Sequence, residues 1–253
     1  MDKTQIIILA GGKGTRMQSN GPKVLVEVGG EPIILRLLKA VETVCSNSTI
    51  IVGYQGEEVI KATENKYHYI WQKEQLGTGH AVACAREALA DEVIKNIVVL
   101  PGDHPLISTE TLEELVRLHE SSGATLTLTT GMADNFIGDF AAFYNFGRIV
   151  RDRTGAVDRI VELKDANEEE KKISEVNFGY YCFDSAWLWK NIDKLKDNNK
   201  AKEYYLTDLV QLAVNQGEKI SVFTTKDTAE GFGINMPEQL AIVEKYLEGL
   251  KII

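Results

Sequence analysis

The stretch Leu9-Ala-Gly-Gly-Lys-Gly-Thr-Arg-Met17 constrains this chain more than any other, and it directly follows the β-branched run Ile6-Ile7-Ile8. A short apolar run of that kind predicts a buried strand. The glycines behind it let the backbone approach a ligand closely, and the N–H groups of such a turn form an anion cradle. Arg16 and Lys23 add two positive charges. Together these features predict a polyphosphate site, with an ordinary glycine-rich turn as the alternative.

Two common phosphate motifs do not match this turn. A P-loop needs a lysine directly after its last glycine, whereas Lys13 precedes Gly14 here. A dinucleotide fingerprint needs a third glycine where Met17 stands. The predicted phosphate site therefore belongs to another class.

The charge balance limits which partners the chain can bind. Its 253 residues carry a formal net charge of −9, which gives a nucleic-acid partner no electrostatic support. A polyphosphate must then be held by local cations and a metal. The length fits one large α/β domain or two small ones.

The cysteines and the N-terminus indicate a compartment. Cys45, Cys84 and Cys182 are odd in number and widely spaced, which favours a reducing environment over a disulfide frame. The polar start and the short apolar run after it do not form a signal peptide, and no run approaches membrane-spanning length. We therefore expect a cytoplasmic protein without a membrane partner.

Strand and helix patterns alternate through the first half of the chain. Strands are predicted at Ile6–Leu9, Thr49–Val52, Tyr69–Trp71, Ile97–Leu100 and Leu126–Thr130. Helices are predicted from Pro32, over Glu57–Lys66 and Ala81–Leu89, and after the capping residue Ser108. This alternation predicts an α/β fold with a Rossmann-like, mostly parallel sheet and helices on both faces. Ligands of such sheets bind beyond the carboxyl ends of the strands.

The alternation breaks near residue 131. The pattern predicts a loop at Asp134–Phe146, a hairpin from Gly147–Arg151 and Val157–Leu163, and a strand at Val176–Phe183. A helix capped by Asp184, a helix at Thr207–Asn215, a strand at Ile220–Phe223 and a terminal helix at Pro237–Leu250 follow. We expect one domain over residues 1–253, with a nucleotide-binding part at about 1–130 and a smaller lobe that returns to the sheet at about 131–253.

Several polar residues could carry chemistry at the ligand edge. Asp103 follows a hydrophobic strand, and a carboxylate there suits Mg²⁺; Asn235 could add a neutral oxygen. Gln72 and Gln75 could read a base edge, because an amide offers a donor and an acceptor together. The alternatives are a solvated loop aspartate, a turn asparagine and exposed glutamines.

Two further residues lie on strands of the second lobe. Glu162 and Asn177 could bind sugar hydroxyls, or they could be exposed strand residues. No Ser/His/Asp triad is present, and His80 and His104 fit supporting roles better than the role of a base.

Several motifs, taken in chain order, resemble those of a known family. The Leu9–Met17 stretch with Pro22-Lys-Val-Leu25 resembles the signature of sugar-1-phosphate nucleotidyltransferases. Further motifs are Gln75-Leu-Gly-Thr-Gly-His-Ala81, Gly102-Asp-His-Pro-Leu-Ile107, Gly147-Arg-Ile149, Ile160–Ala166, Glu175–Gly179 and Glu203-Tyr-Tyr-Leu-Thr-Asp208. The series is similar to the uridylyltransferase domains of the bacterial bifunctional N-acetylglucosamine-1-phosphate enzymes.

The resemblance implies a role for each matching residue. Arg16 and Lys23 would be catalytic, and Asp103 and Asn235 would hold Mg²⁺. The nucleotide would contact Leu9, Ala10, Gly11, Gly12, Gln72, Gln75, Gly77 and Thr78. The sugar would contact Gly102, Gly147, Glu162 and Asn177. The implied reaction joins UTP and N-acetylglucosamine 1-phosphate with release of pyrophosphate.

Three positions depart from that family. Gly11 replaces a common alanine, Phe178 replaces a usual threonine, and Asp134–Phe146 is longer than the usual loop. The printed sequence shows no hexapeptide repeats, so we expect no acetyltransferase activity from it. The remaining alternatives are a nucleotidyltransferase with another base or hexose, and a non-catalytic nucleotide-sugar sensor. The oligomeric state stays open.

Overall fold

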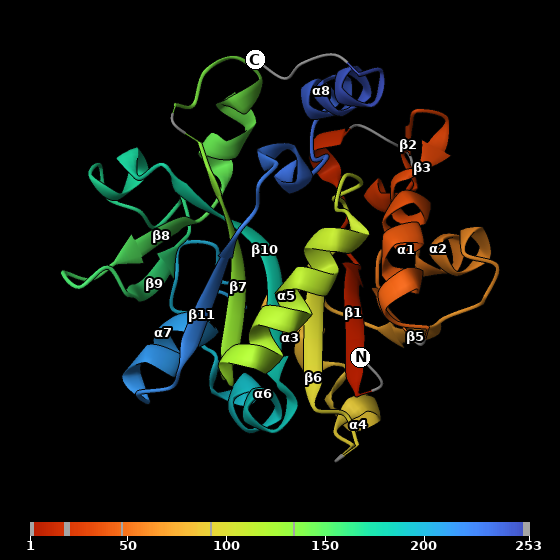
Figure 1. Cartoon of the computed structure of the whole chain (residues 1–253). Coiled ribbons are helices and arrows are strands. Elements are labelled where there is room, and N and C mark those ends of the chain that lie inside the picture. The colour runs from red at the N-terminus through yellow and green to blue at the C-terminus, as the bar shows by residue number, and fades with distance from the viewer. Residues whose placement is uncertain (1–2, 18–20, 47, 92, 134, 250–253) are drawn as a thin grey trace.

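A nine-stranded sheet forms the centre of the computed structural model, which describes residues 3–17, 21–46, 48–91, 93–133 and 135–249. Its main path runs in the order β11-β7-β10-β6-β1-β4-β5 (Figure 1). The strands of this path are β1 (Thr4–Ala10), β4 (Thr49–Val52), β5 (His68–Trp71), β6 (Asn96–Pro101), β7 (Leu126–Met132), β10 (Glu175–Asp184) and β11 (Ile220–Thr224). Off this path, β8 (Arg148–Arg151) and β9 (Val157–Val161) form the predicted hairpin, while β2 (Glu27–Val28) and β3 (Glu31–Pro32) form a separate pair.

Helices cover both faces of this sheet, as predicted. They are α1 (Ile33–Val44), α2 (Gly56–Ala62), α3 (Thr78–Ala83), α4 (Arg86–Leu89), α5 (Thr109–Ser122), α6 (Ser185–Asn191), α7 (Asp208–Asn215) and α8 (Pro237–Leu247). Single turns of 3₁₀ helix are η1 (Thr15–Met17), η2 (Lys23–Leu25), η4 (Glu170–Lys172), η5 (Ile192–Lys194) and η6 (Thr228–Gly231), and η3 (Gly138–Asn145) is longer.

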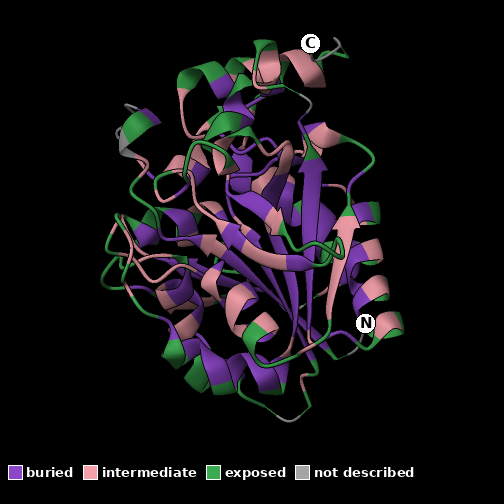
Figure 2. Cartoon of the chain, turned by 90° about the vertical axis from the view of Figure 1, so that its left-hand side faces the viewer, coloured by how far each residue is buried: buried purple, intermediate pink, exposed green. Residues whose placement is uncertain are grey.

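Strand alternation divides the core into two layers. Ile6 and Ile8 of β1 pack with α1, α2, α5 and α8, whereas Ile7 packs with α3, α4, α6 and α7. Successive strand residues point to opposite faces, so a β-branched run fills both layers. Figure 2 shows these strands as a buried centre inside a more exposed rim of helices and loops.

Two capping predictions are confirmed. The Ser108 hydroxyl accepts a hydrogen bond from the Thr111 N–H at 3.1 Å, and Asp184 accepts one from the Trp187 N–H at 2.8 Å. Each cap satisfies a donor that has no partner within the first helical turn.

Two predicted helices differ from the structure. The helix expected at Glu57–Lys66 ends at Ala62, because Glu64 and Asn65 adopt left-handed backbone angles of φ 55° and 54°. The single helix expected at Ala81–Leu89 is split into α3 and α4. The first of them, α3, begins at Thr78, three residues before the expected start at Ala81.

The second half of the chain is less separate than the pattern suggested. β10 lies between β6 and β7 and is antiparallel to both, so the sheet is mixed although mostly parallel. The predicted loop at 134–146 contains the helical segment η3. Asp134 and Leu250, which bound two of the predicted segments, lie outside the described residues.

No helix in the described ranges is both long and apolar enough to cross a bilayer.

Candidate active site

Three strand ends bring Gly11, Gly53 and Gln72 side by side. Ala10 pairs with Val52, and Val52 pairs with Trp71, so the next residue of each strand lies in one row. A Cβ on Gly53 would lie 2.6 Å from the Gly11 carbonyl oxygen, and a Cβ on Gly11 would lie 3.0 Å from Gln72 Oε1. Side chains at these two positions would fill the row.

Gly53 was not predicted as a site residue. The signal was present in the sequence, because a glycine directly after the strand Thr49–Val52 mirrors Gly11 after β1. Gly12 follows Gly11 in the signature. A Cβ built on Gly12 would have no described atom within 4 Å, so this position is open.

The two parts of the signature pack directly on each other. Gly14 has φ 58°, and a Cβ there would lie 2.6 Å from Lys23 Cβ. Only glycine combines this backbone angle with this close approach. The fold thereby brings the glycine turn next to Lys23, while Arg16 is exposed on η1.

Lys23 connects two distant segments of the chain. Its Nζ donates to Asp103 Oδ2 at 2.6 Å and to Asn235 Oδ1 at 2.7 Å. Asp103 follows β6, and its carbonyl accepts the Ile234 N–H at 3.0 Å, which fixes the loop that carries Asn235. The structure thus unites three of the predicted residues around one ammonium group.

The charges at this point are strongly coupled. Burial alone would raise the pKa of Asp103, but the neighbouring Lys23 ammonium holds it below its ordinary value. Burial lowers the pKa of His104 to about 4, so its ring is neutral at neutral pH. His104 Nδ1 lies 2.8 Å from the Tyr180 hydroxyl, which donates to the Glu230 carbonyl at 2.5 Å.

The donor set around Lys23 fits a divalent cation. Asp103 and Asn235 turn a carboxylate oxygen and an amide oxygen toward a common cationic group, and hard oxygens are the ligands of Mg²⁺. Within the described ranges no group of three or more His, Cys, Asp or Glu side chains could hold a metal. Substrate phosphates and water would have to complete a coordination shell, as is usual for Mg²⁺.

The predicted base-reading residues lie at the other end of the row. Gln72 is buried, and its Nε2 donates to the Gly77 carbonyl at 3.0 Å. Gln75 Nε2 donates to the Gln72 carbonyl at 3.1 Å, although Gln75 itself is exposed. The end of β5 and the turn at Gly77 are therefore joined by side-chain hydrogen bonds.

A segment that we call the strap, Glu203–Leu206, fixes this turn from outside. Tyr204 donates its N–H to the Leu76 carbonyl at 2.8 Å and accepts from the Gly79 N–H at 2.8 Å. The Leu206 N–H donates to Thr78 Oγ1 at 3.0 Å. The Glu203–Asp208 motif thus supports the turn, and α7 begins at its last residue, Asp208.

The predicted sugar-side residues also meet. Gly147 accepts the Asn177 N–H at 2.9 Å, and a Cβ on Gly147 would lie 3.4 Å from Glu162 Oε1. Thr207, next to the strap, donates to Glu162 Oε1 at 3.1 Å. Gly102 is the exception, because it lies beside Leu9 at the phosphate end, with its N–H donating to the Leu9 carbonyl at 2.9 Å.

Burial and nearby carboxylates act on Glu162. Burial raises its pKa, and Asp208, Asp165 and Glu203 raise it further, whereas the hydrogen bond from Thr207 lowers it. Asn177 uses both ends of its amide within the chain. Its Oδ1 accepts from the Gly179 N–H at 3.1 Å, and its Nδ2 donates to the Tyr181 hydroxyl at 2.6 Å.

Phe178 belongs to the core and not to the row of site residues. A Cβ on Gly131 or Gly231 would lie 2.0 Å or 2.3 Å from its ring, and the ring stacks on Phe143 of η3 at 5.7 Å. The departure from threonine at this position therefore coincides with the long aromatic segment, because Phe178 and η3 pack together.

Comparison with known proteins defines the family of this chain. The profile of the MobA-like NTP transferase domain matches residues 6–202. The chain belongs to this family. The chain is also 43% identical to the bifunctional protein GlmU of Heliobacterium modesticaldum over 250 residues. It is 39% identical to the bifunctional protein GlmU of Bacillus subtilis over 249 residues. Each alignment covers 98% of this chain and 53% of the relative.

The match to these relatives confirms the predicted homology to the bifunctional enzyme, and the chain spans about half of their length. A solved UDP-glucose pyrophosphorylase complexed with UDP-glucose matches with a TM-score of 0.74 at 18% identity, covering 97% of this chain and 98% of that one. That similarity confirms the predicted fold of this MobA-like NTP transferase domain.

Proposed function

We propose that the protein is a sugar-1-phosphate uridylyltransferase that forms UDP-N-acetylglucosamine and pyrophosphate from UTP and N-acetylglucosamine 1-phosphate. The observation that carries the proposal is the ammonium group of Lys23, held at 2.6 Å from Asp103 and 2.7 Å from Asn235 beside the glycine turn. The 43% identity to a bifunctional GlmU supports the choice of substrates.

The reaction needs no nucleophile from the protein. An oxygen of the sugar phosphate attacks the α-phosphorus of UTP in line, and the bond from that phosphorus to the bridging β-oxygen breaks. Pyrophosphate leaves with the electron pair. The attacking group is already an anion, so no proton has to be removed from it.

The obstacle is the meeting of two anions, and the residues of the site would overcome it by charge neutralisation and positioning. Lys23 is a cation fixed beside the glycine turn, and Arg16 is an exposed cation that would reach the outer phosphates. Asp103 and Asn235 would hold Mg²⁺, which supplies further neutralisation of phosphate charge. The backbone of Leu9, Ala10, Gly11 and Gly12 would line the nucleotide.

The two substrates would be oriented at opposite ends of the site. Gln72, Gln75, Gly77 and Thr78 would contact the base and ribose. Gly147, Glu162 and Asn177 would contact the sugar, and the position of Gly102 beside Leu9 supports contact at the phosphate end. The path from Thr78 through the strap to Thr207 and Glu162 supports a common frame for both ends.

Pyrophosphate release with UTP and N-acetylglucosamine 1-phosphate, with and without Mg²⁺, tests this function. We expect release only when both substrates and the metal are present. A panel of other nucleotides and hexose phosphates separates this reaction from a nucleotidyltransferase of different specificity. A protein that binds UDP-sugar but releases no pyrophosphate with any pair would be a sensor, and the proposal would be wrong.

A further inference from the structure

The side-chain amide of Gln72 has only one possible orientation. The atom 3.0 Å from the Gly77 carbonyl oxygen must be Nε2, because a backbone carbonyl can only accept a hydrogen bond. The same nitrogen lies 3.1 Å from His80 Nδ1. Gln72 is 5% exposed, and its Nε2 has both contacts inside the protein, whereas its Oε1 accepts no hydrogen bond from the described residues.

His80 completes this arrangement as an acceptor. Since both partners of the short contact are nitrogens and Gln72 Nε2 donates, His80 Nδ1 must be unprotonated and its Nε2 must carry the hydrogen. Nε2 has the Cys84 sulfur at 4.0 Å as a weak partner. The Nδ1 atom of His80 therefore accepts a hydrogen bond from the second N–H of the Gln72 amide.

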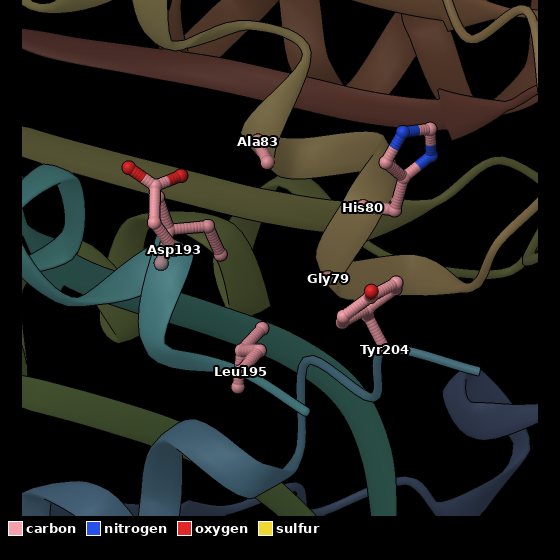
Figure 3. A pocket seen from close by; sticks show the side chains of 7 residues that line it. Gly79, His80, Ala83, Asp193, Leu195 and Tyr204 are labelled. Carbon is pink, nitrogen blue, oxygen red and sulfur yellow. The ribbon is translucent and has the colours of Figure 1, made fainter. Parts of the chain in front are cut away.

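The helix that carries His80 is held by the strap, which also supports the turn at Gly77. His80 lies on α3, between Gly79, whose N–H donates to the Tyr204 carbonyl, and Ala81, whose N–H donates to the Gly77 carbonyl. Figure 3 shows Gly79 next to Tyr204, with the imidazole extending away from Asp193 and Leu195. His80 therefore reaches Gln72 from a fixed helix.

The side-chain oxygen of Gln72 points toward Gly11. A Cβ built on Gly11 would lie 3.0 Å from Oε1, so this oxygen faces the segment that we assign to the nucleotide. An oxygen at this point accepts a hydrogen and cannot donate one. Uracil carries a ring N3–H, whereas cytosine has an unprotonated acceptor nitrogen at the same place.

We propose that His80 is a positioning residue for base selection, which keeps the Gln72 amide turned so that bases with a ring N–H are preferred over their ring-acceptor counterparts. The inference rests on the proposed role of Gln72 at the base and extends it to a residue that does not touch the nucleotide. It predicts that base choice depends on the hydrogen-bonding character of position 80.

Direct binding of UTP and CTP, measured by titration calorimetry with Mg²⁺ present, tests this without turnover. We expect the wild type to favour UTP. His80→Leu removes the acceptor and should reduce the UTP-to-CTP affinity ratio about tenfold, which corresponds to the loss of one buried hydrogen bond. His80→Asn, whose Oδ1 can take the place of Nδ1, should restore most of the ratio.

Cys84→Ala is the matched control, because it changes the other neighbour of His80 and should leave the ratio unchanged. An unchanged ratio in His80→Leu, or an equal loss in His80→Asn, would overturn the proposal. If His80→Leu does not fold, N3-methyl-UTP tests the wild type instead, since equal binding of this analogue and UTP would also overturn it. Selective UTP binding without pyrophosphate release would disprove the proposed reaction and leave this inference standing.

Discussion

At the scale of single residues, charge pairing dominates the candidate site. Asp103 is 8% exposed, and its carboxylate has an ammonium partner at 2.6 Å. A buried carboxylate that loses such a partner is strongly disfavoured. The pair therefore serves the fold as well as the proposed chemistry, and mutations must separate these two contributions.

Lys23→Ala and Asp103→Ala should each lower kcat by about 10²–10³ while the protein stays folded, because Lys23 would neutralise phosphate charge directly and Asp103 would do so through Mg²⁺. Steady-state pyrophosphate release measures the change, and circular dichroism checks the fold. Arg86→Ala is the control, since it removes an exposed ion pair with Asp193. Near-normal turnover in Lys23→Ala or Asp103→Ala would remove that residue from the mechanism.

Glu162 should make stability depend on pH. In the folded protein its pKa is raised above 4.5, the ordinary value for a glutamate. Between the unfolded and the folded pKa, the folded state therefore holds a proton that the unfolded state has lost. Stability should therefore fall as the pH rises through the folded pKa. Glu162→Gln should melt at a higher temperature than the wild type at pH 8, and the difference should shrink toward pH 4.

Thermal melting from pH 4 to pH 8 measures both proteins. Glu168→Gln is the control, because Glu168 is an exposed carboxylate on the surface. A melting difference between Glu162→Gln and the wild type that does not change with pH would contradict the assignment.

At the scale of elements, Phe178 joins three segments of the chain. Its ring fits against Gly131 at β7 and Gly231 at η6, and it stacks on Phe143 of η3. Phe143 also approaches Phe232 at 4.6 Å between ring centroids. This aromatic cluster makes η3 a packing partner of β10 and of the loop that leads to Asn235.

Gly131→Ala should destabilise the protein by about 1–3 kcal/mol, because the new methyl group would overpack against the Phe178 ring. Combining it with Phe178→Thr should cost less than the sum of the two single changes, since the smaller side chain makes room. Chemical denaturation of the four proteins forms a double-mutant cycle. Gly155→Ala, where a Cβ meets nothing within 4 Å among the described atoms but φ is 87°, shows the cost of backbone strain alone.

At the scale of the whole molecule, the proposed nucleotide side and the proposed sugar side share one sheet. β10 and β11 come from the second half of the chain, yet β10 pairs with β6, which in turn pairs with β1. The strap, together with Thr207 beside it, adds a second connection between Thr78 and Glu162. Binding at either end should therefore affect the stability of both halves.

UDP-N-acetylglucosamine with Mg²⁺ should raise the temperature of one cooperative unfolding transition. At 100 times its Kd the ligand adds about 2.7 kcal/mol, which corresponds to several degrees for a chain of this size. Differential scanning calorimetry measures the shift, and UDP-N-acetylglucosamine without metal is the control. Two transitions, with only one of them shifted, would show that the halves unfold separately.

The sequence determined the strands, the glycine turn and the candidate residues, because these depend on local patterns. A β-branched run, a glycine that follows it and a capping serine each act within a few residues, and the strand at Thr49–Val52 matches the structure. The sequence suggested Asp103 and Asn235 as oxygen ligands of one metal, but it did not predict that Lys23 contacts both of them, since no local rule relates positions 23, 103 and 235.

Only the tertiary structure decided which groups meet and what they leave free. The insertion of β10 between β6 and β7, the seating of Phe178 between two glycines, and the strap across the base turn all depend on contacts between distant segments. The orientation of the Gln72 amide is set in the same way, by the Gly77 carbonyl and His80. Local sequence fixes which atoms can donate or accept, whereas the packed fold fixes which partner each atom receives.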